Sequence, residues 1–168
     1  YSNAFADTIN NKMGIFSYVA GSNSNLANYK NWYRLVSTHE LTHIGHMTNN
    51  SALSSKIIKI FGNTFSPNLH SPLSLIEGTA VYSESQLSPS VGRLNGGYYH
   101  EIFKAKAAEG EIPSLAEVNY NHRLFPSDHQ YLYGAKFIDY LNENYDKGKL
   151  ADFFDLYGSY YWSPVLGD

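Results

Sequence analysis

The segment VSTHELTHIGHM, residues 36–47, places two histidines four positions apart with a glutamate directly after the first. On an α-helix, residues four apart lie one above the other on the same face. Two imidazoles at this spacing can bind one tetrahedral zinc ion. Glu40 lies one step round the helix from His39, so it borders such an ion without having to bind it. The pattern His39-Glu40-x-x-His43 therefore predicts a metal-binding helix, with Glu40 placed to activate a zinc-bound water molecule.

The composition limits both the metal ligands and the partners. The chain has 168 residues, of which 43% are hydrophobic and 16% are charged, as expected for one folded domain. Its formal net charge of −3 gives no indication of a nucleic-acid partner or an anionic membrane. No apolar run approaches the roughly 20 residues that cross a bilayer. Because the sequence contains no cysteine, any metal ligand must be histidine, aspartate or glutamate.

The ends of the sequence indicate a piece of a longer protein. The chain starts at Tyr1 and not at methionine, and it stops abruptly after Asp168. We therefore expect residues 1–168 to be a single, truncated domain, with further domains of the same chain and any targeting segment outside it.

Hydrophobic periodicity predicts the fold class α+β, mostly α-helical, with a small β-sheet. MGIFSYVAG is rich in β-branched and aromatic residues and predicts an edge strand near residues 13–20. The strand and the histidine helix, capped by Asn28, would form residues 1–48, and a helical part would follow over residues 49–168. Apolar spacing with start and stop signals predicts helices at residues 29–47, 51–61, 72–85, 96–110, 127–146 and 149–158.

A zinc site needs a third ligand, and the best candidate is Glu77 in SLIEGTAVYSES. This segment has an apolar stripe at Leu73, Ile76 and Ala80, and Glu77 lies within the stripe. A carboxylate on a buried face is costly unless it is paired or binds a metal, and the segment contains no lysine or arginine. The alternative is a glutamate at the edge of the stripe that reaches solvent.

The histidine helix itself offers no third ligand. In the pattern HExxHxxGxxH, position 46 would be glycine and position 49 the third histidine, but this sequence has His46 and Asn49. We therefore expect His46, like His70, His100 and His122, to lie at the surface or at a helix cap.

With Glu77 included, the sequence resembles a known family. His39-Glu40-Leu41-Thr42-His43 followed by Glu77-Gly78-Thr79-Ala80-Val81-Tyr82 is similar to the gluzincins, clan MA zinc metallopeptidases with an HExxH helix and a downstream E-G-x-A-x-Y helix. The similarity is greatest to the M1-like branch and to peptidase MA-like domains. It implies a zincin-like metallopeptidase catalytic domain, with His39, His43 and Glu77 binding one Zn²⁺ per chain and Glu40 acting as general base and acid.

The resemblance also bears on substrate and location. Free-standing peptidase MA-like domains are often extracytoplasmic, which favours a periplasmic or secreted location. The strand expected at Ile15 to Val19 would bind an extended peptide along its edge. M1 aminopeptidases carry a G-x-M-E-N motif in this strand, whereas MGIFSYVAG contains no acidic residue. Endopeptidase and exopeptidase activity both remain open.

Peptide hydrolysis also needs a donor for the oxyanion of the tetrahedral intermediate. Tyr131-Leu132-Tyr133-Gly134-Ala135 is similar to the Y-x-x-G-A helix that carries this tyrosine in M1-like enzymes, which implies Tyr131. Periodicity places Tyr131 on an inward stripe that runs to Tyr145, with Tyr133 directed roughly away from it. The alternatives are Tyr133 or His129 as the donor, with His129 otherwise expected in a solvated loop, or a purely structural Tyr131.

Glu84 lies seven residues after Glu77 on the same helix face, where it either orients His39 or His43 or ends in solvent.

Together these residues predict zinc-dependent hydrolysis of peptide bonds in a peptide or protein substrate. The alternative functions are a metallohydrolase of another substrate class and a binding or regulatory module stabilised by its metal. A structural zinc site usually fills all four positions with protein ligands and has no use for Glu40.

Overall fold

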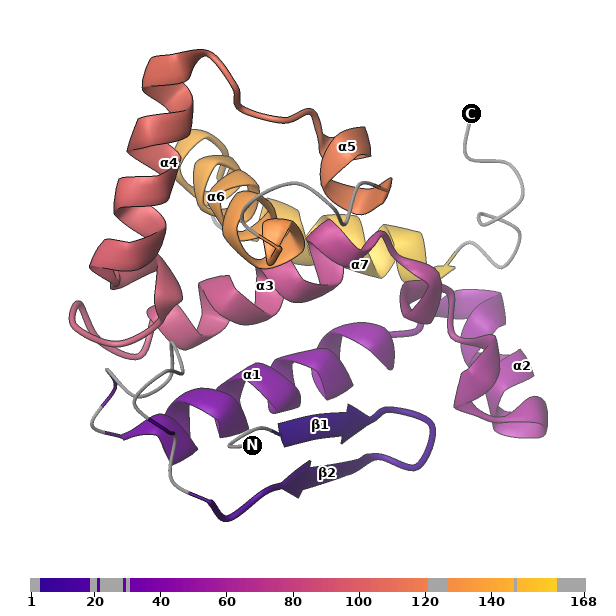
Figure 1. The fold of residues 1–168 in the computed structure, drawn as a ribbon. Coiled ribbons are helices and arrows are strands. Elements are labelled where there is room, and N and C mark those ends of the chain that lie inside the picture. The colour runs from indigo at the N-terminus through magenta and orange to yellow at the C-terminus, as the bar shows by residue number, and fades with distance from the viewer. Residues whose placement is uncertain are drawn as a thin grey trace.

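Helix α1, Trp32–Met47, carries the histidine pair and lies between a small β-sheet and helix α3 (Figure 1). The computed structural model describes residues 4–18, 21, 29, 31–120, 127–146 and 148–159. Helix α1 begins slightly later than predicted because the side chain of Asn31 caps it, accepting a hydrogen bond from the backbone N–H of Arg34. The expected cap, Asn28, lies outside the described residues.

The described part of the chain is mostly helical with one small sheet, as predicted. Five of the remaining helices match predicted segments, and α5 was not predicted. The helices are α2 (Ala52–Phe61), α3 (Leu73–Ser85), α4 (Gly97–Glu109), α5 (Leu115–Tyr120), α6 (His129–Asn144) and α7 (Lys149–Ser159). Within the described residues, 3-10 turns lie between them at Asn63–Phe65, Pro67–His70 and Arg93–Asn95. None of the described helices is long and apolar enough to span a bilayer.

The sheet is an antiparallel hairpin of β1, Ala4–Asp7, and β2, Lys12–Ile15. The predicted strand is therefore present but ends at Ile15, and residues 19 and 20 lie outside the described part of the chain. Strand β1 was not predicted. Strand β1 lines the cavity next to the histidine pair, whereas none of the described residues 15–18 does.

Helices α3 and α6 cross with their backbones in contact. A Cβ atom on Gly78 would lie 2.4 Å from the carbonyl carbon of Gly134, and one on Gly134 would lie 2.2 Å from the carbonyl oxygen of Ser74. Only glycine allows the two helices to approach this closely. The crossing brings Glu77 of α3 and Tyr131 of α6 to the same cavity.

Helix α6 is buried on more than the one stripe that its periodicity predicts. Tyr133, expected to point away from the core, is only 5% exposed and contacts the rings of Phe103 and His129. That expectation is wrong because α4 covers a second face of α6. His129 is also buried and does not lie in a solvated loop. Tyr145, expected inside, is 59% exposed because the backbone leaves the helical conformation at this residue.

Helix α1 packs against α7 through a histidine. The ring of His46 lies 4.0 Å from that of Phe154, and His46 is buried, so its predicted surface position is wrong. Burial lowers the pKa of His46 to about 4, so the ring is neutral at pH 7 and acts as a core aromatic. His70 and His100 are exposed as predicted, and His122 lies outside the described residues.

The close crossing predicts opposite effects for two glycine substitutions. A methyl group at position 134 must push α3 and α6 apart, so Gly134→Ala should lower the free energy of unfolding by about 1–3 kcal/mol. In α1, a Cβ on Gly45 would meet nothing within 4 Å apart from its chain neighbours and the backbone of its own helix. Gly45→Ala is therefore the control, and it should raise stability by up to about 1 kcal/mol through helix propensity. Urea unfolding measures the change in the free energy of unfolding for both variants. Equal changes would contradict the close backbone contact between α3 and α6.

Candidate metal centre

Three potential ligands from α1 and α3 converge on one point. The Nε2 atoms of His39 and His43 lie 3.1 Å apart, and Glu77 Oε2 lies 3.2 Å from the first and 3.3 Å from the second. Both histidines are buried, and the Glu77 side chain is 16% exposed. Among the described residues, these three form a group whose donor atoms are close enough to hold one metal ion.

The charges around this group favour a cation at its centre. Burial alone would raise the pKa of Glu77, but hydrogen bonds with His39 and His43 lower it to about 2. Burial likewise opposes protonation of His39, yet its hydrogen bonds with Glu77 and Glu84 raise its pKa. The carboxylate is thus ionised, and a proton or a metal ion between the facing Nε2 atoms relieves the repulsion of their lone pairs.

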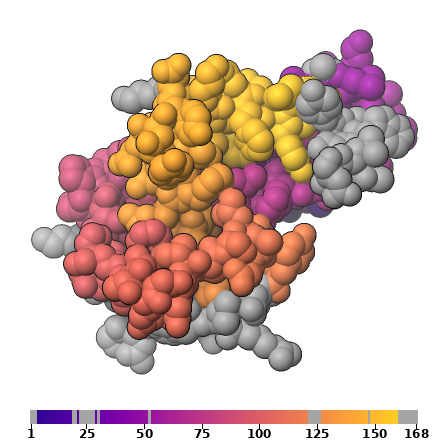
Figure 2. All heavy atoms as spheres, turned by 90° about the horizontal axis from the view of Figure 1, so that it is seen from above, coloured from indigo at the N-terminus to yellow at the C-terminus, as the bar shows by residue number. Residues whose placement is uncertain are grey.

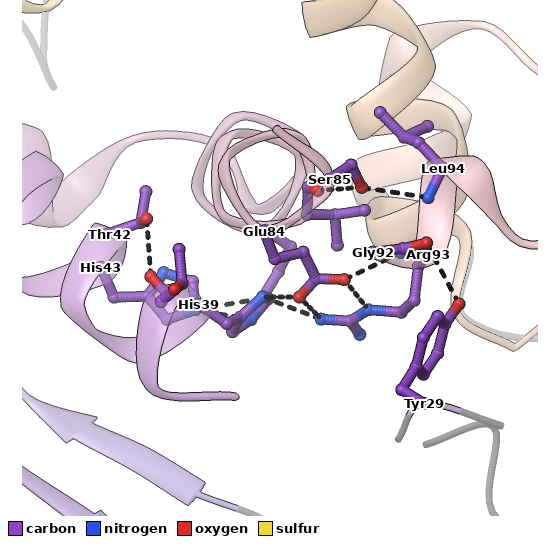
Figure 3. A network of polar contacts seen from close by, with 12 residues as sticks. Tyr29, His39, Thr42, His43, Glu84, Ser85, Gly92, Arg93 and Leu94 are labelled. Atoms are coloured by element: carbon purple, nitrogen blue, oxygen red, sulfur yellow. Dashed lines mark hydrogen bonds and ion pairs between the residues drawn. The ribbon is translucent and has the colours of Figure 1, made fainter. Parts of the chain in front are cut away.

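Glu84 reaches the other side of the His39 ring (Figure 3). Its Oε2 lies 3.1 Å from His39 Nδ1, and the Glu84 side chain is fully buried. When Nε2 holds a metal, the ring proton is on Nδ1, where Glu84 accepts it and orients the ring. Arg93 Nη2 lies 2.8 Å from the same nitrogen. Of the alternatives left open by the sequence, the structure therefore brings Glu84 to His39. The corresponding Nδ1 of His43 has no hydrogen-bond partner among the described residues.

Arg93 compensates the charge of Glu84 and was not predicted. Its Nε and Nη2 donate to the two carboxylate oxygens at 2.8 and 2.9 Å, and its backbone N–H donates to Oε1 at 3.1 Å. Burial opposes the charges of both groups, but their pairing lowers the pKa of Glu84 and raises that of Arg93. Sequence patterns offered no signal for this pair because Arg93 lies in a short turn outside the helix.

The turn that carries Arg93 is pressed against the end of α3. Gly92 has a φ of +92°, and a Cβ there would lie 2.2 Å from the Cα atom of Ser85. The Ser85 hydroxyl accepts a hydrogen bond from the backbone N–H of Leu94 at 3.2 Å, and the Tyr29 hydroxyl donates to the Gly92 carbonyl at 3.2 Å (Figure 3). These contacts hold Arg93 over Glu84.

The metal group faces a cavity of about 480 Å³. Glu40 and Tyr131 line it together with residues of β1. Glu40 is only 7% exposed, and burial raises its pKa. Asp128, at the start of α6, also lines the cavity, and its carboxylate accepts a hydrogen bond from the Tyr99 hydroxyl at 2.8 Å. The sequence did not indicate Asp128 as a residue of the site, and its side chain makes no capping hydrogen bond to α6.

Of the three candidate oxyanion donors, Tyr131 lies in this cavity. Its ring stacks on that of His39 at 6.0 Å, and the Arg93 guanidinium carbon lies 4.9 Å from the ring centre. Tyr133 and His129 instead line a separate cavity of about 400 Å³ next to α4. The position of Tyr131 is therefore the one that the proposed role requires, and the role itself stays a prediction.

The chain was compared with known proteins. No protein-family model, curated protein or solved structure matches it. What the site does must therefore be inferred from its own residues.

The contact between Glu84 and His39 predicts an effect on metal affinity. Glu84→Gln keeps the size of the side chain but removes the charge that supports the His39 N–H, so we expect about 10–100-fold weaker metal binding. Competition titration with a chromogenic chelator measures the affinity, and circular dichroism confirms the fold. Glu101→Gln on the exposed face of α4 is the matched control. Equal affinities for both variants would show that Glu84 does not orient the ligand.

Proposed function

We propose that this protein is a zinc-dependent hydrolase of peptide bonds with a zincin-like catalytic domain of the gluzincin type. The observation that supports this most directly is the separation of the three donor atoms, 3.1–3.3 Å. Nitrogen and oxygen ligands of tetrahedral zinc lie about 2.0–2.1 Å from the metal, which corresponds to about 3.3–3.4 Å between ligands. His39, His43 and Glu77 therefore fit three corners of such a site and leave the fourth open.

Glu40 provides the proton transfer in this proposal. Zinc, when bound, supplies a Lewis acid that activates water and polarises the scissile carbonyl. Glu40 takes a proton from the attacking water while the water oxygen forms a bond to the carbonyl carbon. The same proton passes to the amine as the C–N bond breaks. Burial raises the pKa of Glu40 towards neutral pH. A pKa shifted in this direction suits a group that both accepts and donates a proton.

Tyr131 stabilises the negative charge that develops on the carbonyl oxygen. Burial, followed by the charge of Glu77, raises the pKa of Tyr131, so its hydroxyl stays protonated and can donate a hydrogen bond. The stack on His39 and the Arg93 guanidinium limit the motion of the ring. Glu84 acts through His39 and is a positioning residue.

The wall of the cavity favours a peptide as the substrate. Phe5 and Ala6 of β1 line it, so an extended chain bound in the cavity lies beside a strand. Strands bind extended peptides through backbone hydrogen bonds without selecting a single sequence. A binding module that keeps a metal for stability gives no role to Glu40 or to the open fourth position.

Two substitutions separate catalysis from metal binding. Glu40→Gln should lower kcat on a fluorogenic peptide library by about 10²–10⁴-fold, and Tyr131→Phe by about 10²–10³-fold with little change in KM. Tyr133→Phe, two residues along the same helix but facing the other cavity, is the control and should keep activity. All three variants should keep their zinc.

The outcome of the library screen decides between the functions. Cleavage that needs zinc and is lost in Glu40→Gln supports the peptidase. A zinc-loaded protein that cleaves no peptide in the library but hydrolyses an ester or amide of another class points to a different metallohydrolase. Activity that survives Glu40→Gln contradicts the proposed base.

A further inference from the structure

Helix α2 leaves part of its apolar stripe exposed. Leu53, Ile60 and Phe61 are 55%, 76% and 62% exposed. Among the described side chains of α2, Ser54 is the one that is fully buried. Its hydroxyl donates to the carbonyl oxygens of Ser51 and Gly158. A helix of a folded domain normally turns its apolar stripe towards the core. Helix α2 does this only in part, because Ile57 and Ile58 are partly buried while the three apolar side chains named above are exposed.

Other exposed apolar side chains continue this surface. Phe65 follows α2, and its ring lies 5.6 Å from that of Phe61. The β1–β2 turn is attached here, because Asn63 Nδ2 donates to the carbonyl oxygens of Thr8 and Ile9 at 3.1 and 3.3 Å. Helix α2 and this turn lie at the same end of the molecule (Figure 1), and α2 forms the margin that protrudes beyond α7 in Figure 2. We call Ile9, Leu53, Ile60, Phe61 and Phe65 the end face.

The charges beside the end face are basic. Lys56 and Lys59 are exposed on α2, and at about 100° per residue they border one side of its apolar stripe. The sequence contains no aspartate or glutamate between Glu40 and Glu77, although the chain carries a net charge of −3. The carboxylates of Asp7 and Asp155 lie off the helix and accept hydrogen bonds from the amides of Asn10 and Asn49.

We propose that the end face binds the surface of a membrane that contains anionic lipids. Helices that lie in a membrane interface place leucine, isoleucine and phenylalanine at the acyl boundary and lysine among the headgroups. Each lysine near an anionic surface adds to the electrostatic attraction. Exposed apolar side chains with adjacent lysines and no acidic residue on the helix match this surface better than a mixed-charge protein interface. The net charge of the chain conceals this because none of its acidic residues lies on α2.

This surface also adjoins the metal cavity. The hairpin contributes Ile9 to the end face and Phe5 and Ala6 to the cavity wall. Binding through the end face therefore holds the cavity close to the bilayer. The inference does not depend on the metal or on peptide hydrolysis.

Flotation with vesicles tests the proposal. The intact chain should float with vesicles of equal parts phosphatidylcholine and phosphatidylglycerol, less so at high salt, and much less with phosphatidylcholine alone. Two double variants, Ile60→Ser with Phe61→Ser and Lys56→Glu with Lys59→Glu, should each reduce binding at least tenfold. Matched controls at exposed positions elsewhere, Tyr120→Ser with Leu156→Ser and Lys104→Glu with Lys149→Glu, should keep it.

Three results would overturn the proposal. The first is an intact chain that does not float with the anionic vesicles. The second is binding that the end-face variants and the controls lose equally. The third is a dimer in analytical ultracentrifugation that Ile60→Ser with Phe61→Ser abolishes, together with no vesicle binding, which would assign the end face to a second copy of the chain. Circular dichroism of every variant excludes unfolding as the cause.

Discussion

The interface between α1 and α3 is held together by buried charged groups, each of which would destabilise the fold without its partner. A buried glutamate lies between two histidine nitrogens, and a second buried glutamate lies between one of those histidines and an arginine. Each carboxylate would be costly to bury alone, because removal of a charge from water without a partner costs several kcal/mol. Glu84 is compensated by Arg93 within the protein. Among the described residues, the charge of Glu77 is compensated by His39 and His43, which must either be protonated or share a metal ion. Glu77 is therefore the residue on which the site depends.

The metal group could be predicted from the sequence because its chemistry is local. The histidine spacing fixes one helix face, and a glutamate within an apolar stripe that lacks a basic partner has few physical explanations. The structure brings His39, His43 and Glu77 together as that reasoning requires. Arg93 could not be predicted, because its position is set by the contact of Gly92 with the end of α3 and not by any helical spacing.

Errors in the fold arise where tertiary packing covers a second face. Periodicity assigns one inward stripe to a helix, so it placed Tyr133 outside. His46 was expected at the surface or a cap because it fits no ligand spacing. Helices α4 and α7 bury these two residues. Strand β1 was missed because AFAD contains no β-branched residue. Helix α5 carried a usable signal, since Ser114 and Glu117 form a capping box in which each side chain bonds the backbone N–H of the other.

The metal content of the purified chain tests the central claim most directly. Elemental analysis of the wild type, Glu77→Ala and Glu40→Gln should give one zinc ion per chain in the wild type. Glu40→Gln should keep this zinc, and Glu77→Ala should lose most of it. Full zinc content in Glu77→Ala would contradict the three-ligand site and with it the proposed enzyme class.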